Sequence, residues 1–189
     1  LRALRGEAVG LVFQDPMTRL NPLMTVGEHL LDTLAAHRPA MGHQERQDHA
    51  ESLLEQVGIG AKRFRAYPHE FSGGMRQRLA IALAIALAPP LVIADEPTTS
   101  LDVAVAGQVM AVLRTLCEEL GSALLLITHD LAMANRWCED MAVLDGGRLV
   151  EQNSSTQVLT HPQSDIAKRL VIAARAREGG KTPETPNGT

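Results

Sequence analysis

Two acidic residues stand directly behind a short apolar run, and they are the first candidates for chemistry. Leu91–Ala94 is wholly apolar and is followed at once by Asp95 and Glu96. Such a run is typical of a parallel strand covered on both faces, and open α/β sheets bind ligands at the carboxyl ends of their strands. Adjacent carboxylates there can divide the work, one on a divalent cation and one on a water or proton. An acidic turn is the plainer interpretation of the pair alone.

A second candidate lies upstream, where a serine and two glycines precede an apolar helix. Ser72 is a good N-cap residue, and Gly73 and Gly74 would let the backbone approach a ligand closely. The free N–H groups and positive dipole end at the start of a helix favour an anion. Leu79–Ala88 contains no Gly or Pro and predicts a buried helix, which the next two prolines end. An anion-binding helix start upstream favours the functional interpretation of the acidic pair.

Apolar spacing predicts alternating strands and helices around these candidates. Short apolar runs predict strands at 8–13, 91–94, 123–127 and 141–144, the last forming a hairpin with 148–151. Helical spacing predicts helices at 26–36, 44–57, 103–120, 131–138 and 166–176. Gln14 and His129 each stand just behind an apolar strand, where a polar residue is usually only part of a loop.

Five motifs in this order resemble those of the ATP-binding cassette (ABC) ATPases. In chain order they resemble the Q-loop, the signature motif, the Walker B strand end, the D-loop and the switch histidine. The matching residues are Gln14, Ser72–Arg78, Asp95–Pro97, Ser100–Asp102 and His129. Each motif alone would be a weak signal, but all five follow the order of the family.

The resemblance implies an α/β fold with a mostly parallel sheet flanked by helices. Residues 1–153 would form part of a P-loop NTPase domain of the ABC type, with a helical subdomain over about 17–88. Residues 154–178 resemble the carboxyl extension of the peptide and nickel importer branch, and Met75 in the signature is tolerated in that branch. Residues 179–189 are polar with two prolines and predict a disordered tail.

The resemblance also implies ATP and Mg²⁺ as the cofactors and hydrolysis of ATP as the reaction. Asp95 would hold Mg²⁺, and Glu96 would orient and deprotonate the attacking water. Gln14 would contact the Mg²⁺ and the water, and His129 would donate a hydrogen bond to the γ-phosphate. Phosphoryl transfer of this kind depends mainly on positioning and charge stabilisation.

In this family the catalytic sites are shared between two subunits, so a second ATP-binding subunit is the first partner implied. Ser72, Gly73 and Gly74 would bind the γ-phosphate of ATP held on the facing subunit, and Asp102 would cross the dimer interface. The other implied partners are transmembrane permease subunits and a substrate-binding protein. The protein would be cytoplasmic and peripheral on the inner face of the cell membrane.

Composition agrees with these expectations. The net charge of −4 gives no reason to expect a nucleic-acid groove. No apolar run approaches the roughly 20 residues needed to span a bilayer. Cys117 and Cys138 are too few and too far apart for a disulfide framework, which favours thiols in a reducing compartment.

An ATPase of this type also needs a glycine-rich phosphate loop with a lysine, and the sequence holds none in the required context. Gly180–Thr182 ends like such a loop, but Arg175 stands where its first glycine would be and no strand precedes it. We expect the first strands and the phosphate loop to be missing from the N-terminal side, and this chain alone to be inactive. Truncation is favoured over a natural half-site protein that supplies only the signature, because the catalytic acid Glu96 is present.

The favoured function is therefore the ATP-hydrolysing subunit that energises an ABC transporter, importing peptides, nickel or similar small solutes. Two alternatives differ in class. The first is a soluble ABC ATPase of DNA repair or translation. A repair member would need long coiled coils, and no sustained heptads occur between residues 21 and 71. A translation member would carry two cassettes, and one signature motif occurs in this sequence. A non-catalytic half-site partner would bind no ATP of its own, so a nucleotide-binding assay would separate it from a complete ATPase.

Overall fold

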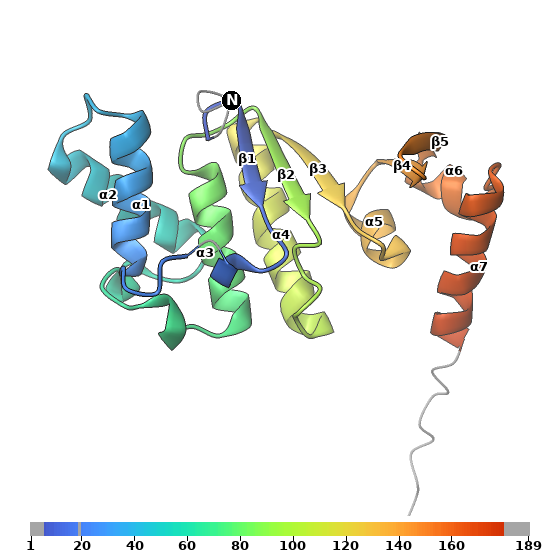
Figure 1. The fold of residues 1–189 in the computed structure, drawn as a ribbon, viewed down its shortest axis with the longest axis horizontal. Coiled ribbons are helices and arrows are strands. Elements are labelled where there is room, and N and C mark those ends of the chain that lie inside the picture. The colour runs from blue at the N-terminus through green and yellow to red at the C-terminus, as the bar shows by residue number, and fades with distance from the viewer. Residues whose placement is uncertain (1–5, 19, 180–189) are drawn as a thin grey trace, which may run out of the picture. The chain divides into compact units, whose positions relative to one another are not determined.

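The computed structural model describes residues 6–18 and 20–179 of the chain (Figure 1). Its contacts divide the chain into two compact units, Leu1–Ile127 and Thr128–Thr189. This boundary differs from the domain boundary predicted at residues 153/154, and the predicted division into domains stays a prediction. The segment at Gly180–Thr182 and nearly all of the predicted tail lie outside the described residues, as does Arg19.

A three-stranded parallel sheet lies at the centre of the first unit. Its strands β1 (Val9–Val12), β2 (Leu91–Asp95) and β3 (Ala123–Ile127) pair in that order. The register sets Val12 opposite Ala94 and Asp95 opposite Ile127. The parallel α/β sheet expected from the sequence is thus confirmed, and the carboxyl ends of all three strands meet at one edge.

Helices pack on the sheet from one side, which corrects the expectation that β2 and β3 are buried on both faces. The covered face carries Val12, Val92 and Ala94, each at most 1% exposed. On the other face Leu125 is 50% exposed and Ile127 47%. The apolar composition of both faces led to the prediction, but within the described residues only one face has helices against it.

Two of these helices begin at the edge where the strands end (Figure 1). Helix α3 (Gly73–Ile85) contacts β1, and α4 (Val103–Leu120) contacts β3 and α3. The predicted helix to Ala88 is three residues too long, because Ala88 leaves the helix with φ of 49° just before the two prolines.

The chain between β1 and α3 is mainly helical, and the helical subdomain predicted over about residues 17–88 stays a prediction. This segment contains α1 (Val26–His37) and α2 (His43–Gln56), with short 3₁₀ turns at η1 (Pro16–Thr18), η2 (Ala61–Arg63) and η3 (Pro68–Glu70). A Cβ added to Gly27 would lie 2.2 Å from the ring of Phe64. The Gly27 N–H also donates to the Phe64 carbonyl, so Phe64 fastens the segment together.

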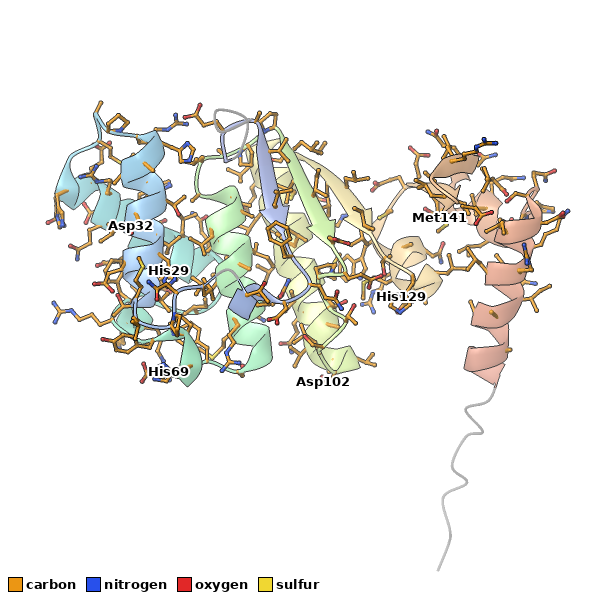
Figure 2. The ribbon with its side chains drawn as sticks, in the orientation of Figure 1. His29, Asp32, His69, Asp102, His129 and Met141 are labelled. Carbon is orange, nitrogen blue, oxygen red and sulfur yellow. The ribbon has the colours of Figure 1, made fainter. Side chains whose placement is uncertain are left out.

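The second unit pairs an antiparallel hairpin with three helices. The predicted hairpin is confirmed as β4 (Asp140–Asp145) and β5 (Arg148–Ser154). The helices are α5 (Leu131–Trp137), α6 (Ser155–Thr160) and α7 (Asp165–Gly179). Its small core contains Met141, which Figure 2 labels, and Val143, Val158 and Ala167. None of the helices described in either unit has both the length and the apolar character needed to cross a membrane.

Candidate functional site

The candidate site in the first unit begins at the carboxyl edge of the sheet. Because Val12 pairs with Ala94, the residues that follow β1 and β2 leave the sheet side by side. Gln14 and Asp95 are both exposed there, and Glu96 is half-buried. The pairing of β1 with β2 therefore brings Gln14 close to Asp95 and Glu96, which follow it by 81 and 82 positions in the sequence.

Glu96 has an unusual backbone conformation. Its φ is +47°, a region that non-glycine residues adopt rarely and at a cost of about 1–3 kcal/mol. Hydrogen bonds stabilise this turn: the Glu96 N–H donates to the Ile127 carbonyl at 2.9 Å, the Thr99 hydroxyl donates to Glu96 Oε2 at 2.7 Å, and the Thr99 N–H donates to the Glu96 carbonyl at 3.4 Å. Residues held in such conformations concentrate at functional sites, so the geometry adds to the case for Glu96.

The start of α3 has the N-cap that the sequence predicts. Ser72 Oγ accepts a hydrogen bond from the Met75 N–H at 3.4 Å, and the first turn of the helix carries no acidic residue. Ser72 and Gly73 are exposed, whereas Gly74 is buried. The exposed N-terminus of α3 thus keeps a neutral cap and the positive end of its dipole.

Packing explains one of the two glycines better than ligand approach does. A Cβ on Gly74 would lie 2.5 Å from Val105 Cγ1, and a Cβ on Gly73 would lie 3.2 Å from Leu101 Cδ2. Leu101 belongs to the D-loop, and Val105 belongs to the first turn of α4. Gly74 is therefore required where two helix starts pack together, a reason that the sequence did not reveal.

Asp102 lies at the start of α4 (Figure 2). Its Oδ1 accepts a hydrogen bond from the Val105 N–H at 2.9 Å, which makes it the N-cap of the helix. The side chain is exposed, so capping leaves it at the surface. The role expected for Asp102 across a dimer interface stays a prediction.

His129 falls in the second unit, where it precedes the N-cap of α5 (Figure 2). It is exposed, and the neighbouring Asp130 accepts a hydrogen bond from the Met133 N–H at 3.0 Å. The predicted role of His129 at a γ-phosphate stays a prediction.

Sequence reasoning assigned no role to two polar residues beside the candidate site. Thr99 holds the Glu96 carboxylate, and Gln77 is only 2% exposed, with its Nε2 donating to the Phe13 carbonyl at 3.2 Å. The available signal for Gln77 was a single amide between two arginines of the signature motif. The hydroxyl three residues after Glu96 gave a weaker one.

The donor set at this edge suits a hard cation only in part. Across the described residues, no group of three or more His, Cys, Asp or Glu side chains could hold a metal ion by itself. Mg²⁺ is commonly held by one or two carboxylates together with substrate phosphates. The exposed carboxylate of Asp95 fits that mode of binding.

Comparison with known proteins agrees with this geometry. The sequence pattern described as "ABC transporter" matches residues 2–99, just over half of the chain. The chain belongs to the ABC transporter family. The fold agrees, since the ATP-binding cassette MJ0796, solved as a dimer bound to ADP and Pi, has a TM-score of 0.70. It is 32% identical in sequence, over 82% of this chain and 66% of that chain.

Two bacterial relatives are named as transport proteins. The peptidoglycan transport ATP-binding protein YejF of Agrobacterium fabrum is 45% identical over 92% of the chain. The oligopeptide transport ATP-binding protein OppD of Haemophilus influenzae is 41% identical over 96% of the chain. The chain spans 32% of the length of the first relative and 56% of the second.

Proposed function

We propose that this chain is part of the ATP-hydrolysing subunit that energises an importer of peptides or similar small solutes. The observation that carries the proposal is the shared edge of the first unit. There the carboxylate-tipped β2, the strand end before Gln14 and the starts of α3 and α4 lie together (Figure 1). The relatives named as peptidoglycan and oligopeptide transport ATP-binding proteins support the choice of solute class.

In the proposed reaction Glu96 orients a water molecule and accepts its proton as the water attacks the γ-phosphate. The Thr99 hydroxyl, which donates to Glu96 Oε2, fixes the carboxylate without supplying a proton to the reaction. Asp95 would hold Mg²⁺, which when bound neutralises phosphate charge. Gln14 would position the water from the neighbouring strand end, and His129 would donate to the γ-phosphate.

The start of α3 serves the nucleotide of a facing subunit in this proposal. The exposure of Ser72 and Gly73 and the uncompensated helix N-terminus support binding of a phosphate there. Asp102 would cross the same interface. The partners are then a second ATP-binding subunit, transmembrane permease subunits and a substrate-binding protein, with the ATPase attached to the inner face of the membrane.

The proposal can be tested by joining this chain to the preceding region of Haemophilus influenzae OppD, which would supply a phosphate loop. We expect the chimera to hydrolyse ATP, because the two composite half-sites are then complete. Glu96→Gln should lower kcat by at least 100-fold and trap ATP in a stable dimer, because the general base is lost while binding is kept.

The matched control is Glu118→Gln, which removes an exposed carboxylate that pairs with Arg114 one helical turn away. Turnover by the Glu96 variant at the rate of this control would remove Glu96 from its role. Tight ATP binding by the 189-residue chain without the added region would contradict the expectation that it needs a phosphate loop from outside.

A further inference from the structure

A buried amide joins helix α3 to the strand end that precedes Gln14. Gln77 is 2% exposed, and its Nε2 donates to the Phe13 carbonyl across 64 positions of sequence. Phe13 is the residue directly before Gln14, and Gln77 lies in the second turn of the helix that Ser72 caps. One hydrogen bond therefore connects the neighbourhoods of two predicted site residues.

A second contact shows that α3 follows β1 along its length. A Cβ added to Gly10 would lie 2.3 Å from the carbonyl oxygen of Ala84 in α3. From Gln77 to Ala84 the helix makes two turns, a rise of about 10 Å. From Gly10 to Phe13 the strand also advances about 10 Å. The helix and the strand thus run in opposite directions in contact at two levels.

These contacts leave little freedom for the strand end and the helix start to shift independently. Gly10 admits no side chain between the two backbones, and α3 also contacts η1, the turn that follows Gln14. Packed interiors deform little, so α3 and β1 resist relative shifts at Gly10, and the Gln77 hydrogen bond extends this restraint to the strand end at Phe13.

We propose that Gln77 is a positioning residue that makes the strand end at Gln14 and the helix start at Ser72 shift together. The inference rests on the proposed function, in which Gln14 serves the nucleotide of its own subunit and Ser72 that of the facing subunit. Loss of the γ-phosphate beside Gln14 would then be transmitted through Phe13 and Gln77 to the second site. The two nucleotide sites would be coupled inside each subunit as well as across the dimer.

The first test measures amide hydrogen exchange in the 189-residue chain with Gln77→Met, which keeps the length of the side chain and removes its donor. The reporters are the Thr18 and Leu20 N–H groups, which donate to the Asp15 and Pro16 carbonyls in and beside η1. We expect both to exchange about tenfold faster, because the preceding strand end has lost its tie. Unchanged exchange at both reporters would overturn the proposal.

Gln56→Met is the matched control, since the Gln56 amide donates to Ser52 one turn earlier on α2, away from η1. It should leave both reporters unchanged. Gln77→Glu supplies a conservative rescue: a protonated carboxyl can donate to the Phe13 carbonyl and a carboxylate cannot. After correction for intrinsic rates, its excess exchange should vanish as the pH is lowered, and excess exchange that is independent of pH would contradict a role for the donor.

The second test follows nucleotide response in the OppD chimera. We expect ATP to change exchange in residues 13–18 and 72–76 together, and Gln77→Met to confine the change to one segment and lower kcat about tenfold with KM unchanged. A joint response in Gln77→Met would overturn the coupling. If the parent chimera neither binds nor hydrolyses ATP, the proposed function fails, and the tie is decided by Thr18 and Leu20 alone.

Discussion

Helices α3 and α4 begin at the same edge of the first unit, but their starts differ in charge. In each helix the N-cap side chain accepts a hydrogen bond from the backbone N–H three residues later; the cap is Ser72 in α3 and Asp102 in α4. The carboxylate of Asp102 offsets the positive dipole end of its own helix, whereas the Ser72 hydroxyl does not. Of these two neighbouring starts, only that of α3 keeps its attraction for an outside anion.

The two starts are also in contact, so they cannot be considered separately. Gly74 in the first turn of α3 lies against Val105 in the first turn of α4, and Gly73 lies against Leu101. A shift of the α3 start on binding a phosphate would therefore also displace the D-loop of the same subunit. The comparison teaches that Gly73 and Gly74 let a helix start with a neutral cap pack against one with a charged cap.

The largest effect is expected from Gly74→Ala. Its Cβ would come within 2.5 Å of Val105 Cγ1, on a stiff branched side chain, and such overpacking costs about 1–3 kcal/mol of unfolding free energy. The measurement is urea denaturation of the chain. Gly107→Ala is the control, because a Cβ there meets nothing within 4 Å and should stabilise α4 by about 0.5–1 kcal/mol.

Shortening the Val105 side chain tests whether the clash with the new Cβ causes the loss of stability. The double variant with Val105→Ala should recover part of the stability lost in Gly74→Ala, since the clashing methyl group is gone. Full additivity of the two substitutions would show that the clash is not responsible.

Exchanging the caps should separate stability from anion binding. Ser72→Asp keeps a good N-cap, so unfolding free energy should change by less than about 0.5 kcal/mol. The added carboxylate should nevertheless weaken ATP-dependent dimerisation of the OppD chimera at least tenfold, by repelling the phosphate. Sedimentation velocity with and without ATP measures this.

The reverse substitution, which gives α4 a neutral cap, is the control for Ser72→Asp. Asp102→Ser also keeps a cap, and the stability of the chain should again change by less than about 0.5 kcal/mol. If Ser72→Asp dimerised with ATP as well as the parent does, the α3 start would not be the phosphate site.

The smallest effect concerns a third helix start, that of α1. Thr25 and Glu28 form a capping box, in which the Glu28 carboxylate accepts from the Thr25 N–H and hydroxyl. Hydrogen bonding from the Thr25 backbone, then from its hydroxyl, lowers the pKa of Glu28 from 4.5. This stabilisation is complete above the unfolded pKa and is lost as the pH falls through the lower, folded pKa.

Glu28→Gln should therefore flatten the pH dependence of stability below about pH 4.5 and change little at pH 7, because a Gln at that position can still complete a capping box. Urea midpoints of both proteins between pH 3 and pH 7 provide the measurement. Parallel pH profiles would show that the carboxylate contributes nothing.

Much of the fold could be predicted because it depends on local patterns. Apolar runs ended by turn residues located the three parallel strands and the hairpin, and the serine at 72 marked the start of α3. The end of α3 was less accurate, since the apolar run continues to Ala88 while the helix ends at Ile85. Hydrophobic composition alone does not show where the backbone turns away.

Candidate site residues could also be proposed from sequence, because an acid after a strand and a cap before a helix depend on residues within a few positions. Tertiary structure alone decided that Gly74 packs on Val105, that Gln77 reaches Phe13, and that one face of the sheet lacks a helix cover among the described residues. Those contacts join segments distant in the chain, so no local spacing encodes them. They arise only when the elements are packed against each other.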